Sequence, residues 1–160
     1  MLKEKLFVRR ALVSDAQNIA RVGLDSARVE VREEPLDLPE DEYALIWAQR
    51  IKEGSHVTYL CCRKSGLLQR EELCGYGSVE APLKTGHVLT LYVSPKFMRR
   101  GIGSLLMQTI EKEVRNSGGS SLETDVQPRN VMAHNFYQKC GFVFTDRRRD
   151  ELIVMRKELV

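Results

Sequence analysis

The segment from residue 89 to residue 106 constrains the fold more than any other part of the chain. The run Leu89-Thr90-Leu91-Tyr92-Val93 is rich in aliphatic, β-branched and aromatic residues, which favours a β-strand that ends at Ser94-Pro95. The apolar residues that follow recur at helical spacing and predict an amphipathic helix: Ile102, Leu105, Leu106, Ile110 and Val114. The chain therefore holds a strand and a helix joined by a short loop, and this loop contains Gly101 and Gly103.

A strand, a glycine-bearing loop and a helix N-terminus together can bind an anion. The first N–H groups of a helix lack an intrahelical acceptor, and the macrodipole adds about half a positive charge at that end. Gly101 and Gly103 let these groups approach a phosphate closely, and Arg99 and Arg100 add positive charge. A lone Gly-x-Gly is equally compatible with a loop whose glycines only permit the turn. The P-loop and the dinucleotide fingerprint are excluded, because their remaining residues are absent.

Strand and helix signals are spread over the rest of the chain. Strands are predicted over residues 6–12, 56–62, 73–80, 87–94 and 121–126, with a closing hairpin over 142–145 and 151–157 and turns at Gly66 and Ala81-Pro82. Helices are predicted from Ala16 to Gly23, from near Glu40 to Gly54, from Ile102 to about Val114 and from Asn130 to Cys140. This order indicates an α/β (α+β) fold with a mixed central sheet of about six to seven strands flanked by about four helices. Because no linker or repeat interrupts the chain, residues 1–160 are predicted to form a single domain.

Nothing in the sequence predicts a membrane span or a secretory signal. No apolar run reaches the roughly 18 residues that cross a bilayer, and no apolar region follows the charged N-terminus. The cysteines have no zinc-binding spacing, and Cys61, Cys62 and Cys74 lie among strand-forming residues, where reduced thiols pack as small apolar groups. We therefore expect a cytoplasmic protein with no metal site and no membrane partner.

The charged residues are separated along the chain, although the formal net charge is only +3. Acidic residues gather between Glu30 and Glu42, whereas arginines gather at Arg99-Arg100 and at Arg147-Arg148-Arg149. This separation would suit a cofactor with several phosphates and a cationic acceptor. Both clusters are also compatible with solvated surface, the acidic one at a helix N-terminus and the arginine run at a hairpin tip. So small a net charge does not favour a nucleic-acid partner.

Two stretches in the second half of the chain resemble the GNAT superfamily of acetyl-CoA-dependent N-acetyltransferases. The first runs from Leu91 to Gly103 and is similar to the family's Val-x-Pro strand end and its Gln/Arg-x-x-Gly-x-Gly/Ala pyrophosphate loop. The second contains Asn130, Ala133, Phe136-Tyr137 and Gly141-Phe142, and it resembles the family's Asn-x-x-Ala…Tyr-x-x-x-Gly-Phe element. The opening Val8-Arg9-Arg10-Ala11 also looks like the family's first strand.

The resemblance implies that acetyl-CoA is the cofactor and identifies the residues that would hold it. In the family, the strand that corresponds to Leu91–Val93 splays from its neighbour, pantetheine lies in the gap, and strand N–H groups hold the thioester carbonyl. The cofactor-binding residues implied in this way are Leu91, Tyr92, Val93, Met98, Arg99, Arg100, Gly101, Ile102, Gly103, Ser104, Asn130, Ala133 and Tyr137. Met98 departs from the Gln or Arg that is usual in the family. Since the turn works mainly through backbone N–H groups, we expect this change to lower affinity without abolishing binding.

Acetyl transfer to an amine needs a neutral nitrogen, a donor to the developing oxyanion and a proton for the leaving thiolate. The resemblance implies that Tyr137 protonates the thiolate, although this residue could instead pack as a core aromatic side chain. Asn130 also suits the N-cap of the last helix. The candidates for the general base are Asp125, which matches an acidic position in some N-terminal amine acetyltransferases of the family, and then Glu80 and His87 at neighbouring strand ends. Asp125 is also compatible with a cap on the following turn.

The sequence therefore predicts an N-acetyltransferase that moves the acetyl group of acetyl-CoA onto a primary amine of a small molecule or protein by direct attack on the thioester. The alternative is a non-catalytic acyl-CoA-binding regulatory module, which would keep the turn at residues 99–103 without needing Tyr137 or Asp125. The acidic stretch falls where the family forms its acceptor lid, which favours a cationic amine or a basic peptide. Pairing of the closing hairpin with a second copy is compatible with the sequence, although no residue requires a homodimer.

Overall fold

The computed structural model describes residues 5–30, 36–80 and 84–160. In chain order the helices and strands are β1 (Leu6–Arg10), α1 (Ala16–Ala27), α2 (Glu40–Glu53), β2 (His56–Ser65), β3 (Arg70–Glu80), β4 (Thr85–Val93), α3 (Ile102–Asn116), β5 (Ser121–Val126), α4 (Val131–Lys139), β6 (Val143–Arg149) and β7 (Leu152–Glu158). This order confirms the predicted α/β fold with a mixed sheet and flanking helices. The predicted turn at Ala81-Pro82 lies outside the described residues. None of the described helices has the length and apolar character needed to cross a membrane.

The described strands form one seven-stranded sheet in the order β1-β2-β3-β4-β5-β7-β6. Neighbouring strands run antiparallel, except β4 and β5, which run parallel. A parallel pair cannot be joined by a hairpin, because the chain must return to the starting edge before the second strand begins. Helix α3 makes this return, and residues 94–101 connect the end of β4 to its N-terminus.

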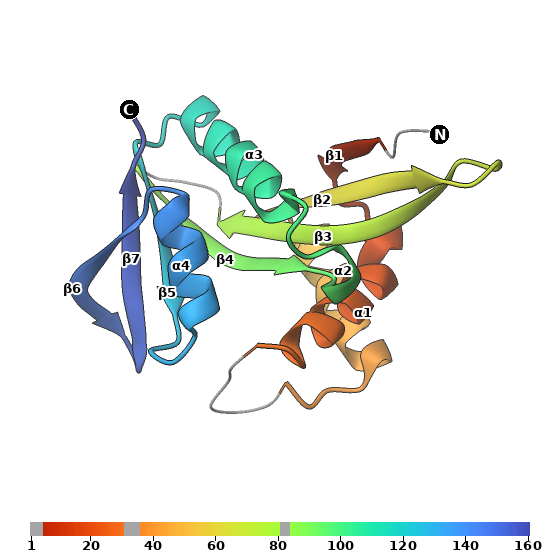
Figure 1. The fold of residues 1–160 in the computed structure, drawn as a ribbon, viewed down its shortest axis with the longest axis horizontal. Helices are drawn as coiled ribbons and strands as arrows, with labels where there is room; N and C mark the ends of the chain where they lie inside the picture. Colours follow the sequence, from red (N-terminus) through yellow and green to blue (C-terminus); the bar gives the residue numbers. More distant parts are fainter. Residues whose placement is uncertain (1–4, 31–35, 81–83) are drawn as a thin grey trace.

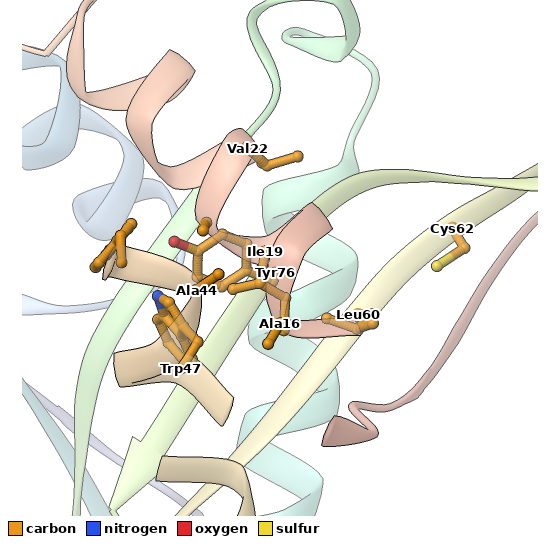
Figure 2. Close-up of a cluster of buried hydrophobic side chains, with 10 residues drawn as sticks. Ala16, Ile19, Val22, Ala44, Trp47, Leu60, Cys62 and Tyr76 are labelled. Atoms are coloured by element: carbon orange, nitrogen blue, oxygen red, sulfur yellow. The ribbon is translucent and has the colours of Figure 1, made fainter. Parts of the chain in front are cut away.

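Helices cover both faces of the sheet (Figure 1). On one face, α1 and α2 pack on a buried cluster that includes Ile19, Trp47 and Tyr76 (Figure 2). On the other face, α3 packs on a second cluster that contains Ile110 and Leu122 and extends to α4. Successive side chains of a strand point to opposite faces, and because helices cover both faces, β3 buries apolar side chains on each side, such as Tyr76 beneath α1 and α2 and Val79 beneath α3.

The cysteines pack as apolar residues in this sheet, as predicted. Cys62 of β2 enters the cluster beneath α1 and α2, whereas Cys61 and Cys74 enter a group beneath α3. Burial raises the pKa of the Cys61 thiol to about 11. The thiol is therefore protonated at neutral pH and is a poor nucleophile.

Helix α1 continues to Ala27, and the prediction that it ends at Gly23 was wrong. Gly23 is needed for close packing: a Cβ atom at this position would lie 2.3 Å from the Tyr76 hydroxyl oxygen and 3.1 Å from Tyr43 Cε1. The absent side chain lets α1 approach an aromatic group in which the Trp47 and Tyr76 ring centroids lie 5.2 Å apart, edge to face (Figure 2). Gly54, by contrast, ends α2 as predicted, with a left-handed φ of 66°.

The arginine run does not form the solvated hairpin tip that we expected. It belongs to β6, and the turn follows at Asp150-Glu151. Arg147 and Arg149 reach across the sheet to Glu123 of β5, which also accepts a hydrogen bond of 2.9 Å from Arg156 of β7. Glu123 is only 7% exposed, so these ion pairs join the last three strands around a buried charge.

Candidate active site

The sheet opens between β4 and β5. The two strands pair only from Thr85 and Ser121 to Val88 and Thr124. Beyond this point residues 89–93 of β4 have no partner in β5, and Figure 1 shows the two strands diverging. A β-bulge at Leu89 interrupts the register with β3 at the same place. Because bulges bend the strand that contains them, the bulge accounts for the divergence and leaves backbone groups of residues 89–93 facing a gap.

The predicted anion site lies beside this gap. Gly101 caps α3 with φ 79°, a left-handed conformation that glycine adopts without strain. The first intrahelical bond runs from Leu105 N–H to Gly101 O at 3.0 Å, so the N–H groups of residues 102–104 precede it. A Cβ atom at Gly103 would lie 2.9 Å from the Phe136 ring of α4. This second glycine therefore lets α3 and α4 approach each other closely.

A cleft of about 1020 Å³ follows the gap. Its lining includes residues 89–93 of β4, the turn before α3, one side of α4, Ser26 of α1, and Glu30, which lies just beyond the end of α1. Every residue predicted to bind the cofactor lines this cleft except Arg100, whose guanidinium carbon lies 5.3 Å from the centroid of the Phe97 ring. The structure thus brings together residues that were predicted from two separate stretches of sequence, and Arg99 is the arginine of the pair that lines the cleft.

Tyr137 lies where the two strands separate. Burial raises the pKa of its hydroxyl to about 12, with smaller contributions in the same direction from Cys140 and Glu30 and an opposing one from a hydrogen bond with Thr124. Thr124 is the last residue of β5 that pairs with β4, and its hydroxyl donates to Val88 O at 3.3 Å. Tyr137 is only 7% exposed, yet it lines the cleft. The phenol is therefore both packed in the core and available, in its protonated form, as a proton donor.

Asn130 connects the start of α4 to Glu30. Its Oδ1 accepts a hydrogen bond of 3.0 Å from Ala133 N–H, which makes it the N-cap of α4 as predicted. Its amide nitrogen donates to Glu30 Oε1 at 2.9 Å. Ser26 Oγ in turn donates to Val93 O at 2.9 Å. The end of α1 is therefore bonded to β4 through Ser26. The residues just after α1 are bonded to the start of α4 through Glu30.

Asp125 lines the cleft and takes part in a charged cluster. Arg149 Nη1 lies 2.8 Å and 3.0 Å from its two carboxylate oxygens, and His87 Nε2 lies 3.1 Å from Oδ2. A proton taken up by Asp125 would weaken its ion pair with Arg149. Glu80 is exposed at the end of β3, in register with His87, and neither of these two residues lines the cleft.

Among the cleft residues that escaped the sequence reasoning as individuals are Ser26, Glu30 and Thr124. Glu30 belongs to the acidic stretch that was recognised as a whole, but its partner Asn130 is 100 residues away in the chain. Thr124 directly precedes Asp125 and carried no signal of its own, because a threonine inside a strand is ordinary. Only the register of β4 with β5 shows that Thr124 marks the point of divergence.

The chain belongs to the acetyltransferase (GNAT) family, whose model matches residues 24–142. The matched range includes both stretches on which the resemblance was based. Among curated relatives, the aminoglycoside N(6')-acetyltransferase type 1 of Stenotrophomonas maltophilia is 32% identical over 56 residues. That alignment spans 35% of this chain and 37% of the relative, so it covers little more than a third of either protein.

Solved structures of the same fold match over nearly the whole chain. The PaiA N-acetyltransferase of Thermoplasma acidophilum, solved in complex with coenzyme A, has a TM-score of 0.72 at 18% identity, covering 96% of this chain and 99% of that chain. YncA of Salmonella typhimurium, solved with its cofactor acetyl-CoA, has a TM-score of 0.69 at 16% identity, covering 98% of this chain and 95% of that chain. At these identities the likeness shows a common fold.

Proposed function

We propose that the protein is an acetyl-CoA-dependent N-acetyltransferase that acts on a primary amine. The observation that carries this proposal is the opening between β4 and β5, with the N-terminus of α3 beside it and the buried phenol of Tyr137 at the point of divergence. Membership of the acetyltransferase family supports acetyl-CoA as the donor. The partial match to an aminoglycoside N-acetyltransferase supports nitrogen as the acceptor atom.

The residues present fit the donor. The turn before α3 offers N–H groups and Arg99 to a pyrophosphate, and a Cβ atom added at Gly101 would meet open space, so no side chain closes the turn. Residues 89–93 have no partner in β5, so they offer backbone groups on that side to the peptide-like amides of pantetheine, in the way that one strand pairs with another. The cleft volume, about 1020 Å³, is large enough for such an arm.

Bound acetyl-CoA supplies a thioester, which is an activated acyl group with a thiolate as its leaving group. In the proposed mechanism, N–H groups of β4 near Leu91–Val93 donate to the thioester oxygen, where negative charge develops. Tyr137 gives its proton to the sulfur as the carbon–sulfur bond breaks. Its pKa of about 12 keeps the phenol protonated at neutral pH, so the proton is present when it is needed.

The acceptor amine must lose a proton before it can attack, because a primary ammonium has a pKa near 10. Of the predicted bases, Glu80 and His87 do not line the cleft, and Asp125 lines it while paired with Arg149.

Ligand-dependent unfolding tests the donor site. Acetyl-CoA at about 100 times its dissociation constant should stabilise the protein by roughly 2.7 kcal/mol, which raises the Tm by roughly 5 to 10 °C for a chain of this length. ATP at the same concentration is the control, since it carries phosphates but no pantetheine arm. No shift with saturating acetyl-CoA would refute the proposed cofactor site.

Replacement of Tyr137 by phenylalanine tests catalysis. The Tyr137→Phe variant should bind acetyl-CoA with the same thermal shift but transfer acetyl groups at a rate lower by about two orders of magnitude, the usual contribution of a general acid. An acyl-CoA-binding module without catalysis would show the thermal shift and no turnover in either protein. Equal rates in both proteins would remove Tyr137 from the mechanism.

A further inference from the structure

We propose that the carboxylate of Glu30 binds the ammonium group of the acceptor and takes up its proton. The inference rests on the proposed function and assigns the one step of that mechanism for which the predicted candidates are poorly placed. It also defines the acceptor class: an amine that arrives as a cation. Glu30 is half-buried, lines the cleft and lies just beyond the end of α1.

The segment that carries Glu30 is held in place by two hydrogen bonds. Ser26 Oγ donates to Val93 O, which places the last turn of α1 against the end of β4. Glu30, four residues further along the chain, accepts from Asn130 Nδ2 at the start of α4. The segment from Ser26 to Glu30 is thereby attached to both sides of the opening in the sheet. An acceptor that reaches the gap from this side meets the Glu30 carboxylate.

The Glu30 carboxylate is held in a defined orientation. Asn130 is 4% exposed, and its Oδ1 is committed to Ala133 N–H as the cap of α4. The amide nitrogen of Asn130 must then point the other way, toward Glu30 Oε1 at 2.9 Å. A group that accepts a proton in a reaction has to be held within reach of the reacting atom, and this cap provides that constraint. Asn130 therefore acts as a positioning residue.

Glu30 also lies near the proton donor of the proposed mechanism. It is close enough to Tyr137 for its charge to contribute to the raised pKa of the phenol. Asp125, the other carboxylate that lines the cleft, accepts from Arg149 through both oxygens, and a proton on Asp125 would disrupt that ion pair. A proton acceptor and a proton donor within electrostatic range in one cleft are the pair that acyl transfer needs.

The ammonium gives one proton to Glu30, which passes it to solvent, and the neutral nitrogen forms a bond to the acyl carbon. As the carbon–sulfur bond breaks, the Tyr137 proton goes to the sulfur. The second proton that leaves the nitrogen restores the neutral phenol, so one proton is released for each acetyl group transferred.

The decisive variant is Glu30→Gln, because glutamine keeps the shape of the side chain and can still accept from Asn130. Asp37→Asn is the matched control: Asp37 belongs to the same acidic stretch, is exposed and does not line the cleft, so this variant loses the same charge without touching the site. Acetyl transfer to a polyamine, a lysine peptide and an aminoglycoside is measured for each protein from pH 6.5 to 9.5. Thermal shift with acetyl-CoA is measured in parallel.

Glu30→Gln should bind acetyl-CoA normally but lose about 100-fold or more in kcat/KM at neutral pH, the usual contribution of a general base. The ratio of wild-type to variant kcat/KM should fall by about tenfold for each unit that the pH rises, because the variant depends on the small fraction of amine that is already neutral. Asp37→Asn should follow the wild type. A Glu30→Gln variant with wild-type activity and pH profile overturns the inference. A wild type that binds acetyl-CoA but acetylates no amine overturns the proposed function and the inference with it.

A second measurement does not depend on the acceptor. Tyrosines labelled with carbon-13 allow the Tyr137 pKa to be followed by NMR in the same proteins. Removal of the Glu30 charge should lower this pKa in Glu30→Gln and leave it unchanged in Asp37→Asn. Equal values in all three proteins would place the Glu30 charge away from the phenol and overturn the geometric argument.

Discussion

Replacement of Gly23 by alanine should disturb the packing between α1 and the sheet. The added Cβ atom would lie 2.3 Å from the Tyr76 hydroxyl oxygen, well inside van der Waals contact, and 3.1 Å from Tyr43 Cε1. Overpacking of this kind costs about 1–3 kcal/mol. Alanine also favours a helix interior over glycine by about 1 kcal/mol, which offsets part of that cost. We therefore expect a net destabilisation of about 0–2 kcal/mol for Gly23→Ala.

The collision has a specific partner, so a second substitution should remove it. Among the described residues the buried Tyr76 hydroxyl has no hydrogen-bond partner, and burial of an unpaired hydroxyl costs about 1–3 kcal/mol. Tyr76→Phe should therefore be neutral or stabilising by about 1 kcal/mol. With the oxygen gone, the nearest ring atom of residue 76 lies 3.5 Å from the new Cβ atom, which is ordinary contact. The double variant should then keep the helix-propensity gain without the 2.3 Å collision, and only the 3.1 Å contact with Tyr43 Cε1 remains tight.

Urea unfolding of the four proteins in this double-mutant cycle measures the coupling between the two sites. We expect a favourable coupling of about 1–3 kcal/mol, equal to the clash that the second substitution relieves. For a chain of this length each kcal/mol corresponds to roughly 2–4 °C in Tm, so thermal unfolding gives an independent reading. Additive effects within about 0.5 kcal/mol would refute the packing explanation for Gly23.

Three further outcomes follow from groups described above. Burial tends to raise the pKa of Glu123, but its arginine partners lower this pKa overall. The ion pairs of Glu123 therefore stabilise the fold at pH values above the ordinary glutamate pKa. This stabilisation is lost as the pH falls through the lowered pKa. Glu123→Gln should therefore be less stable than the wild type at neutral pH in urea titrations and should lose less stability below about pH 4.5. The raised pKa of Tyr137 stabilises the fold below the ordinary tyrosine value near 10, and this stability is lost as pH rises toward about 12. Tyr137→Phe should lack that alkaline loss in the same assay. Met98→Arg, at a position that lines the cleft, should tighten coenzyme A binding up to about tenfold in calorimetry, with the gain reduced by salt.

The parts of the site that the sequence predicted are those whose determinants are local. The turn before α3 depends on Gly101, on Gly103 and on the strand just before them, all within one short stretch. Asn130 and Tyr137 lie on one helix, so their common face follows from helical spacing. Helical spacing indicated the common face and the resemblance to the family indicated the roles, and the structure places both groups on one cleft.

The parts that were missed depend on contacts between distant residues. Gly23 has the sequence signature of a helix end, and only the position of Tyr76 on β3 shows that it is a packing residue. Arg149 belongs to a run typical of a solvated tip, and its partner Asp125 lies two strands away across the sheet. The bond between Glu30 and Asn130 likewise exists only in the folded chain.

The opening between β4 and β5 has a consequence for solubility. It creates a sheet edge in the middle of the sheet, over residues 89–93. Free strand edges recruit extended chains and promote aggregation unless something covers them. Here the cover is partial, because α4, Ser26 and Glu30 line the cleft and, of these, only the Ser26 hydroxyl is bonded to the strand, at Val93 O. A pantetheine arm that pairs with β4 would complete the cover, so the bound cofactor would protect the protein from self-association as well as supply its acetyl group.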